Sequence, residues 1–94
     1  MRYYVYVLLC QDGTFYTGYA KDLSARLEMH EQGKGARYTR IHKPKRLVHT
    51  EEFGTRREAM RREREIKKLG HEEKKSLCRF AITRRQTSKH KSTR

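Results

Sequence analysis

The order of hydrophobic and polar positions predicts three strands, with helices between and after them. Residues 2–10 are rich in β-branched and aromatic side chains, which is typical of a strand. Asp12-Gly13 is a turn signal, so residues 14–19 are expected to return as an antiparallel strand. Residues 46–53 predict a third strand. Gly18 lies inside the second strand, where a glycine marks a bend or the close approach of another group.

The first helix is predicted from its ends and its apolar spacing. Asp22 is a candidate N-cap, and Gly33 lies where a C-cap is expected. Between them, Leu23, Leu27 and His30 follow the i, i+4, i+7 pattern of a short amphipathic helix. Because of this spacing, His30 is expected to be half-buried beside Arg26.

Two further helices are expected in the C-terminal half. Residues 55–58 form a capping box that begins a helix running to about Leu69. Residues 72–80 predict a short last helix that buries Leu77 and Phe80. Residues 83–94 contain basic residues but no acidic or apolar ones, so they are expected to be a disordered basic tail. The chain is therefore interpreted as one domain over residues 1–82 and a tail over residues 83–94.

The charge of the chain indicates its class of partner. Its 94 residues make one small domain with a formal net charge of +13. This charge favours a polyanionic partner, for which nucleic acid is the first choice. No apolar run approaches the length of a membrane span, and no broad basic amphipathic helix suits a membrane surface. Residues 34–46 contain basic residues and no acid, and they are expected to form a mobile basic loop.

The cysteines indicate a reducing compartment. Cys10 and Cys78 are the only two, and they are far apart in the sequence. This count argues against a cysteine-based zinc site and predicts two buried free thiols. The first strand lacks the small-residue cleavage site of a signal peptide. A cytoplasmic location is therefore predicted.

Candidate catalytic groups cluster in the first third of the chain. Arg26 and His30 stand four residues apart, on one face of the first helix. Such a pair suits phosphate contact and proton transfer, although the solvent side of a helix is the commonest place for these residues. Tyr6 and Tyr16 lie on adjacent strands. Strand tyrosines mostly pack their rings, and one of these could serve as a base only if nearby cations lowered its pKa.

Glu63 is the most informative residue of the second long helix. It shares a face with Ala59 and Ile66, and a carboxylate on an apolar face is costly unless it pairs or binds a cation. One interpretation is an ion pair with a nearby arginine. The other is a Mg²⁺ site, since magnesium is often held by one carboxylate together with water and phosphate oxygens. The spacing alone modestly favours the ion pair.

Taken in order, these residues resemble the GIY-YIG nuclease superfamily, in particular its small single-domain members. The likeness covers residues 3–80. The first motif stands as Tyr4-Val5-Tyr6 and the second as Tyr16-Thr17-Gly18, followed by Arg26, His30 and the helix that carries Glu63. Each triplet alone is a weak signal, and the ordered set is a fairly strong one.

The resemblance implies an α+β fold, a three-stranded antiparallel sheet flanked by helices in the order ββαβαα. It also implies divalent-metal-dependent cleavage of phosphodiester bonds, with Mg²⁺ or Mn²⁺ as cofactor. Tyr6 and Tyr16 would then be the motif tyrosines, one of them a candidate base. Arg26 would hold the scissile phosphate, and His30 would assist proton transfer. Glu63 would anchor the metal, and Gly18 would be the structural glycine of the second motif.

The sequence departs from the family pattern in three places. Tyr4 replaces the usual glycine of the first motif, and the chain contains no asparagine, which some members place near the site. Tyr19 stands where relatives similar to excinuclease C carry a lysine. Phosphate neutralisation is therefore expected from Lys21 and the basic loop. The residues predicted to bind nucleic acid are Lys21, Lys34, Arg37, Tyr38, Arg40, Lys43, Lys45 and Arg46.

Three functions remain open at this point. The first, which the intact ordered set of polar residues favours, is an endonuclease in a repair or processing role, with DNA favoured over RNA. The second is a nucleic-acid-binding module of the same fold with little or no catalysis, which the basic loop and tail would support. The third is an interaction protein whose basic surface meets an acidic partner. A separate protein partner could supply targeting, and the sequence does not determine the oligomeric state.

Overall fold

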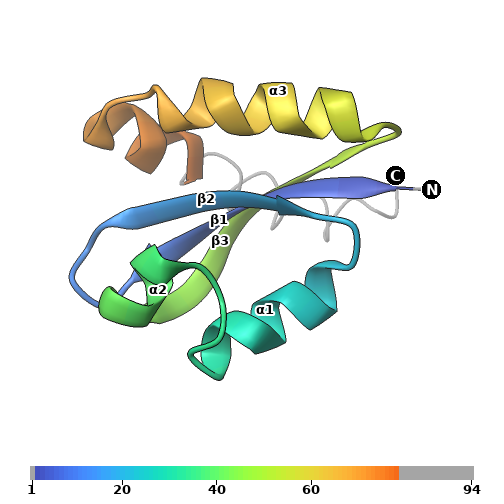
Figure 1. Ribbon diagram of the computed structural model, residues 1–94. Helices are drawn as coiled ribbons and strands as arrows, with labels where there is room; N and C mark the ends of the chain where they lie inside the picture. Colours follow the sequence, from blue (N-terminus) through green and yellow to red (C-terminus); the bar gives the residue numbers. More distant parts are fainter. Residues whose placement is uncertain (1, 79–94) are drawn as a thin grey trace, which may run out of the picture.

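The computed structural model describes residues 2–78 and shows a small sheet with helices on both faces (Figure 1). Residues 71–78 form a further helical segment after the last named helix. The named elements are β1 (Tyr3–Cys10), β2 (Phe15–Ala20), α1 (Leu23–Glu31), α2 (Arg37–Ile41), β3 (Pro44–Phe53) and α3 (Arg56–Lys67). The predicted α+β fold is confirmed, with α2 as an added short helix.

The sheet is antiparallel, with strand order β2-β1-β3. The central strand β1 is largely buried, because it has a neighbour on each side. Tyr6 on β1 lies opposite Gly18 on one side and Thr50 on the other. This register makes Tyr6 and Gly18, one from each predicted motif, direct cross-strand neighbours.

The two faces of the sheet are covered by different helices. Figure 1 shows α3 and the segment 71–78 on one face, and α1 and α2 on the other. The main hydrophobic core lies under α3 and is made by Val5, Val7, Val48, Ala59, Ile66 and Cys78. No helix within residues 2–78 is long and apolar enough to cross a membrane. Cys10 and Cys78 are both buried and free, as predicted.

The predicted helix ends are confirmed at the atomic level. The side chain of Asp22 accepts a hydrogen bond from the Ala25 amide at 3.0 Å, and Thr55 caps α3 in the same way through the Glu58 amide. At the end of α1, Gly33 has a φ of +76°. The Gly33 amide donates to His30 and the Lys34 amide to Met29, which closes a Schellman motif.

The segment between α1 and β3 differs from its prediction. It was expected to be a loop over residues 34–46, but α2 forms inside it, and β3 begins two residues earlier, at Pro44. A proline is tolerated at the first position of a strand because its missing N–H is not needed there. At the other end of the fold, α3 ends at Lys67 rather than at about Leu69. The predicted burial of Phe80 and the predicted tail, residues 83–94, lie outside the described residues.

Candidate active site

Tyr6 is the centre of the candidate site. Its side chain is 0% exposed and points to the face of the sheet that α1 covers. The Tyr6 hydroxyl lies 2.8 Å from Nε2 of His30, and Nε of Arg26 donates to it at 3.3 Å. The structure therefore brings together three of the predicted residues, from β1 and α1.

The hydrogen bonds around His30 determine its protonation. The Thr39 hydroxyl donates to the carbonyl of Ala36 at 2.9 Å, so its oxygen accepts from Nδ1–H of His30 at 2.7 Å. Nε2 is then left as an acceptor for the Tyr6 hydroxyl. Burial first, and the charge of Arg26 second, lower the pKa of His30, which favours the same neutral form. His30 is 2% exposed, so it is fully buried rather than half-buried as predicted.

The pKa of Tyr6 is raised, whereas a tyrosine that acts as a base needs a lowered pKa. Burial raises the pKa of Tyr6 to about 12, and this effect outweighs the lowering by the hydrogen bond from Arg26. Nearby cations were expected to be able to lower a tyrosine pKa in this cluster. At Tyr6 the loss of hydration has the stronger influence, so in the protein alone this residue is a neutral phenol.

Two glycines make room for the buried pair. A Cβ on Gly18 would lie 2.6 Å from the Tyr6 hydroxyl oxygen, closer than side-chain packing permits. A Cβ on Gly35 would overlap the ring of His30 in the same way. The predicted structural role of Gly18 now has a physical cause: β2 must approach the phenol of Tyr6.

Tyr16 continues the cluster toward the surface. Its ring centroid lies 5.3 Å from that of His30 and 6.2 Å from that of Tyr6. On its other side, Tyr38 stacks at 5.9 Å, and His42 stacks on Tyr38 at 4.2 Å. Tyr16 is half-buried, whereas Tyr38 is exposed. Of the two motif tyrosines, Tyr16 is therefore the one that solvent reaches.

Arg26 is held between the two motif tyrosines. Its pKa is raised above the usual value, first by the hydrogen bond to Tyr6 and to a smaller extent by Tyr16. The side chain is half-buried, and its charge is fixed beside the phenols. A guanidinium in this position is suited to a phosphate oxygen, because it is planar and permanently charged.

Glu63 approaches the cluster from the other helix layer. It lies on α3, where its side chain is 16% exposed and pairs with Nζ of Lys67 at 3.3 Å. The ion pair expected from the sequence is present, with a lysine as partner instead of an arginine. The charge of Glu63 contributes to raising the pKa of Tyr6, so it lies within electrostatic range of that phenol. Within residues 2–78, no hydrogen bond joins Glu63 to Tyr6, Tyr16 or Arg26.

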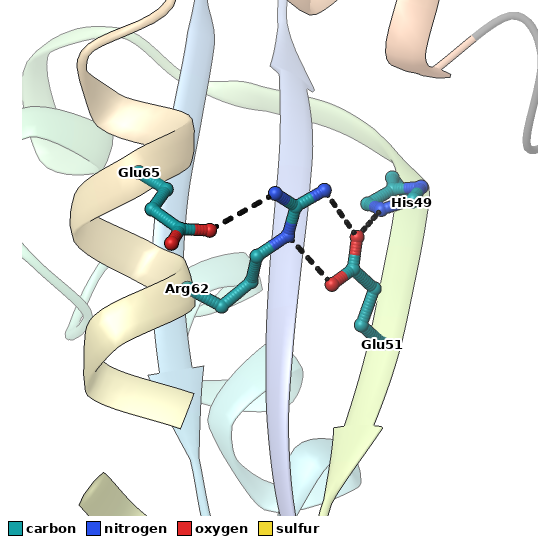
Figure 2. A network of polar contacts seen from close by, with 4 residues as sticks. All are labelled: His49, Glu51, Arg62 and Glu65. Atoms are coloured by element: carbon teal, nitrogen blue, oxygen red, sulfur yellow. Dashed lines mark hydrogen bonds and ion pairs between the residues drawn. The ribbon is translucent and has the colours of Figure 1, made fainter. Parts of the chain in front are cut away.

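A separate polar network fixes α3 on the sheet (Figure 2). Arg62 donates to Glu51 on β3 through Nε at 2.8 Å and through a terminal nitrogen at 3.1 Å. The buried His49 lies 2.7 Å from the same carboxylate, and Arg62 also reaches Glu65 on its own helix. Burial alone would raise the pKa of Glu51, but the bonds from His49 and Arg62 lower it to about 2. This network fixes the helix that carries Glu63.

The residues predicted to contact nucleic acid all lie at the surface. Three of them stand on α2, which packs against the cluster through the buried Thr39. The exposed residues are Lys21, Lys34, Arg37, Tyr38, Arg40, Lys43, Lys45 and Arg46.

Sequence reasoning missed two residues of this site. Thr39 is 2% exposed and fixes the tautomer of His30, but a threonine between basic residues carries no signal of burial. Gly35 was noted only as part of the basic loop. A glycine near a histidine that is expected to be half-buried is a usable signal for close packing, and it would have pointed to Gly35.

Comparison with known protein families supports a nuclease-type fold for this domain. Residues 2–76 match the family described as the GIY-YIG catalytic domain. The chain belongs to this family.

The more specific relatives are proteins named UPF0213. One from Staphylococcus saprophyticus is 46% identical over 76 residues, which is 81% of this chain and 93% of that protein. One from Staphylococcus aureus is 47% identical over 75 residues, 80% of this chain and 92% of that protein.

Two solution NMR structures are also similar. The UPF0213 protein of Bacillus halodurans has a TM-score of 0.56 and 48% identity, with 85% of each chain covered. A protein from E. faecalis has a TM-score of 0.59 and 43% identity, again with 85% of each chain covered. These matches place the chain among small proteins that are nearly all this one domain.

Proposed function

We propose that this protein is a divalent-metal-dependent endonuclease that hydrolyses phosphodiester bonds in nucleic acid, with DNA favoured over RNA, in repair or processing. The observation that carries the proposal is the contact of Arg26 with the buried Tyr6–His30 pair, beside the solvent-reached Tyr16. A fixed guanidinium next to an accessible phenol is an arrangement suited to phosphate chemistry. Membership of the GIY-YIG family supports the same conclusion.

The residues present fit a single Mg²⁺ or Mn²⁺ ion. Residues 2–78 contain no group of three His, Cys, Asp or Glu side chains that could enclose a metal. Among residues 2–78, the partly exposed carboxylate of Glu63 pairs with one surface lysine. It fits an ion that takes one protein ligand and completes its shell with water and phosphate oxygens. When bound, such an ion would neutralise negative charge on the scissile phosphate as it develops.

The protein side chains then have distinct tasks. Arg26 donates hydrogen bonds to the phosphate, and Tyr6 holds Arg26 in place through its Nε–H. Both ring nitrogens of His30 are occupied, so we assign it the positioning of Tyr6 in place of direct proton transfer. Tyr16 is reached by solvent, and in its phenolate form it would accept the proton of the attacking water. Tyr6 is too deeply buried for that task.

The test is cleavage of supercoiled plasmid DNA and of structured RNA, with Mg²⁺, with Mn²⁺ and with EDTA. We expect Glu63→Gln and Arg26→Ala each to lower the cleavage rate by about 100-fold or more, because each removes a charge that acts on the transition state. Glu72→Gln is the matched control, since Glu72 is an exposed carboxylate on the segment 71–78. Equal cleavage by all four proteins, or cleavage in EDTA, would contradict the proposal. Circular dichroism confirms that each variant folds.

The second candidate function is a nucleic-acid-binding module without turnover. It is favoured by the exposed basic residues of α2 and its flanks, because neutralising phosphates is sufficient for salt-sensitive binding. Filter binding across a salt series, followed by product analysis after long incubation, separates the two. Tight association with no metal-dependent product would support the binding module.

A further inference from the structure

The outer side of α3 carries a row of arginines that neither the predicted site nor the basic segment at α2 includes. Arg56, Met60 and Arg64 follow one another at intervals of four residues, so they share one side of the helix. Together with Arg57 they line an open hollow of about 460 Å³. The three arginines are exposed, and Met60 is half-buried.

Two of the three arginines in this hollow are not used by the fold. Neither Arg57 nor Arg64 makes a side-chain hydrogen bond or an ion pair with any other described residue. Arg62, on another side of the same helix, contrasts with them because it is paired with Glu51. The last acidic residue of the sequence is Glu73, so residues 79–94 bring no acidic side chain to pair with them. Concentrated positive charge without an internal partner is electrostatically suited to an anionic ligand.

The hollow lies beside the candidate active site, across the edge of the sheet. Arg56 donates to the Tyr19 hydroxyl at 3.2 Å, which joins it to β2. The same edge strand carries Tyr16 and Gly18. Further along α3, Glu63 pairs with Lys67. The helix α3, which carries the hollow, and the α2 segment therefore belong to opposite helix layers (Figure 1).

We propose that Arg56, Arg57 and Arg64 form a second binding site for the phosphate backbone of the substrate, on the side of the active site away from α2. Arginine suits this task because its planar group holds phosphate oxygens in a bidentate manner. Met60, which also lines the hollow, offers an apolar contact for a sugar. A substrate strand would then cross the edge of β2, with phosphates held on both helix layers. This inference rests on the proposed function only for the choice of nucleic acid as ligand.

The test measures binding without cleavage. The affinity of a fluorescein-labelled DNA duplex for the full chain is determined in EDTA by anisotropy, over a series of KCl concentrations. Each phosphate contact contributes about 0.9 to the slope of log affinity against log salt for duplex DNA. We expect Arg57→Gln/Arg64→Gln to reduce the slope by about 1.8. Arg57→Lys/Arg64→Lys keeps both charges and is expected to retain the slope.

The matched control is Lys74→Gln/Lys75→Gln, which removes two positive charges from the segment 71–78 and is expected to leave the slope near that of the wild type. A slope for Arg57→Gln/Arg64→Gln equal to the wild-type slope would overturn the second site, as would an equal drop in the control. If the double variant does not fold, the single variants Arg57→Gln and Arg64→Gln are expected to lose about 0.9 each. Because no cleavage is measured, a failed nuclease assay leaves this result intact.

Discussion

At the scale of single residues, the site depends on the space that two glycines leave open. Tyr6 is a full-sized phenol inside a three-stranded sheet, and its hydroxyl has two partners to reach. Gly18 lets it extend past β2, and Gly35 lets His30 meet it from the other side. A glycine is therefore needed at position 18 of the second motif because the phenol of Tyr6, from the first motif, occupies the space of a Cβ.

We expect Gly18→Ala to destabilise the protein by about 1–3 kcal/mol, because the new Cβ would displace the Tyr6 phenol from Arg26 and His30. Urea denaturation of the two proteins measures the difference. Gly54→Ala is the control, since a Cβ there would meet nothing within 4 Å. Its stability should stay within about 1 kcal/mol of the wild type. Equal stabilities for Gly18→Ala and Gly54→Ala would show that the space at Gly18 is not required.

Protonation is also decided at the residue scale. A tyrosine near an arginine is expected from its neighbours to have a lowered pKa, and Tyr6 has a raised one. The sequence predicts that Arg26 lies near Tyr6, but it does not predict how deeply Tyr6 is buried. Burial has the larger effect on the pKa of Tyr6. Tyr16, on the adjacent strand, keeps contact with solvent.

At the scale of elements, α3 is held to the sheet by two different interactions. Ala59 and Ile66 pack in the core, and Arg62 binds Glu51 on β3 (Figure 2). The Glu51 pKa of about 2 lies below its usual value of 4.5, so folding favours the ionised form. This stabilisation is present above pH 4.5 and is lost as the pH falls toward 2.

We therefore expect Glu51→Gln to be less stable than the wild type at pH 7, by up to about 3 kcal/mol. The difference should shrink as the pH is lowered from about 4.5 toward 2. Urea denaturation at a series of pH values measures it. Glu52→Gln is the control, because the one partner of Glu52 in the described part of the chain is the exposed Arg2, and such surface pairs contribute at most about 1 kcal/mol. A difference that is independent of pH would argue against this ion pair as its source.

At the scale of the whole molecule, the two free cysteines report on the central strand and on the core under α3. Cys10 lies on β1, and Cys78 lies in the core under α3. Both are buried, and burial raises the pKa of each thiol, to about 11 for Cys78. Little thiolate is then available at neutral pH, and reagents have little access to it.

We expect both thiols of the native protein to resist iodoacetamide at pH 8, and to react at the rate of a free thiol in urea. Peptide mass spectrometry gives the rate at each position. Increasing urea should expose both cysteines together if the central strand and the core under α3 unfold as one cooperative unit. Rapid native labelling of either cysteine would show that its surroundings open independently.

The sequence by itself determined the three strands and the two long helices. These elements were predicted from local signals, namely the caps at Asp22 and Thr55, the turn at Asp12-Gly13 and the ordered motifs. Local signals remain valid in the folded protein because residues that are neighbours along the chain are also neighbours in space. The three strands and the α+β fold followed from them. Short α2 was missed, because its basic residues gave no apolar period and its one buried residue, Thr39, is polar.

Only the tertiary structure decided how these residues meet. It paired Tyr6 with Gly18, closed the chain of hydrogen bonds from Arg26 to Thr39, and gave Glu63 a place on the opposite helix layer from Arg26. It also left Arg57 and Arg64 without partners among the described residues while pairing Arg62. Burial and pairing depend on groups that are far apart in the sequence. The sequence alone therefore does not determine the pKa of a side chain or its hydrogen-bond partner.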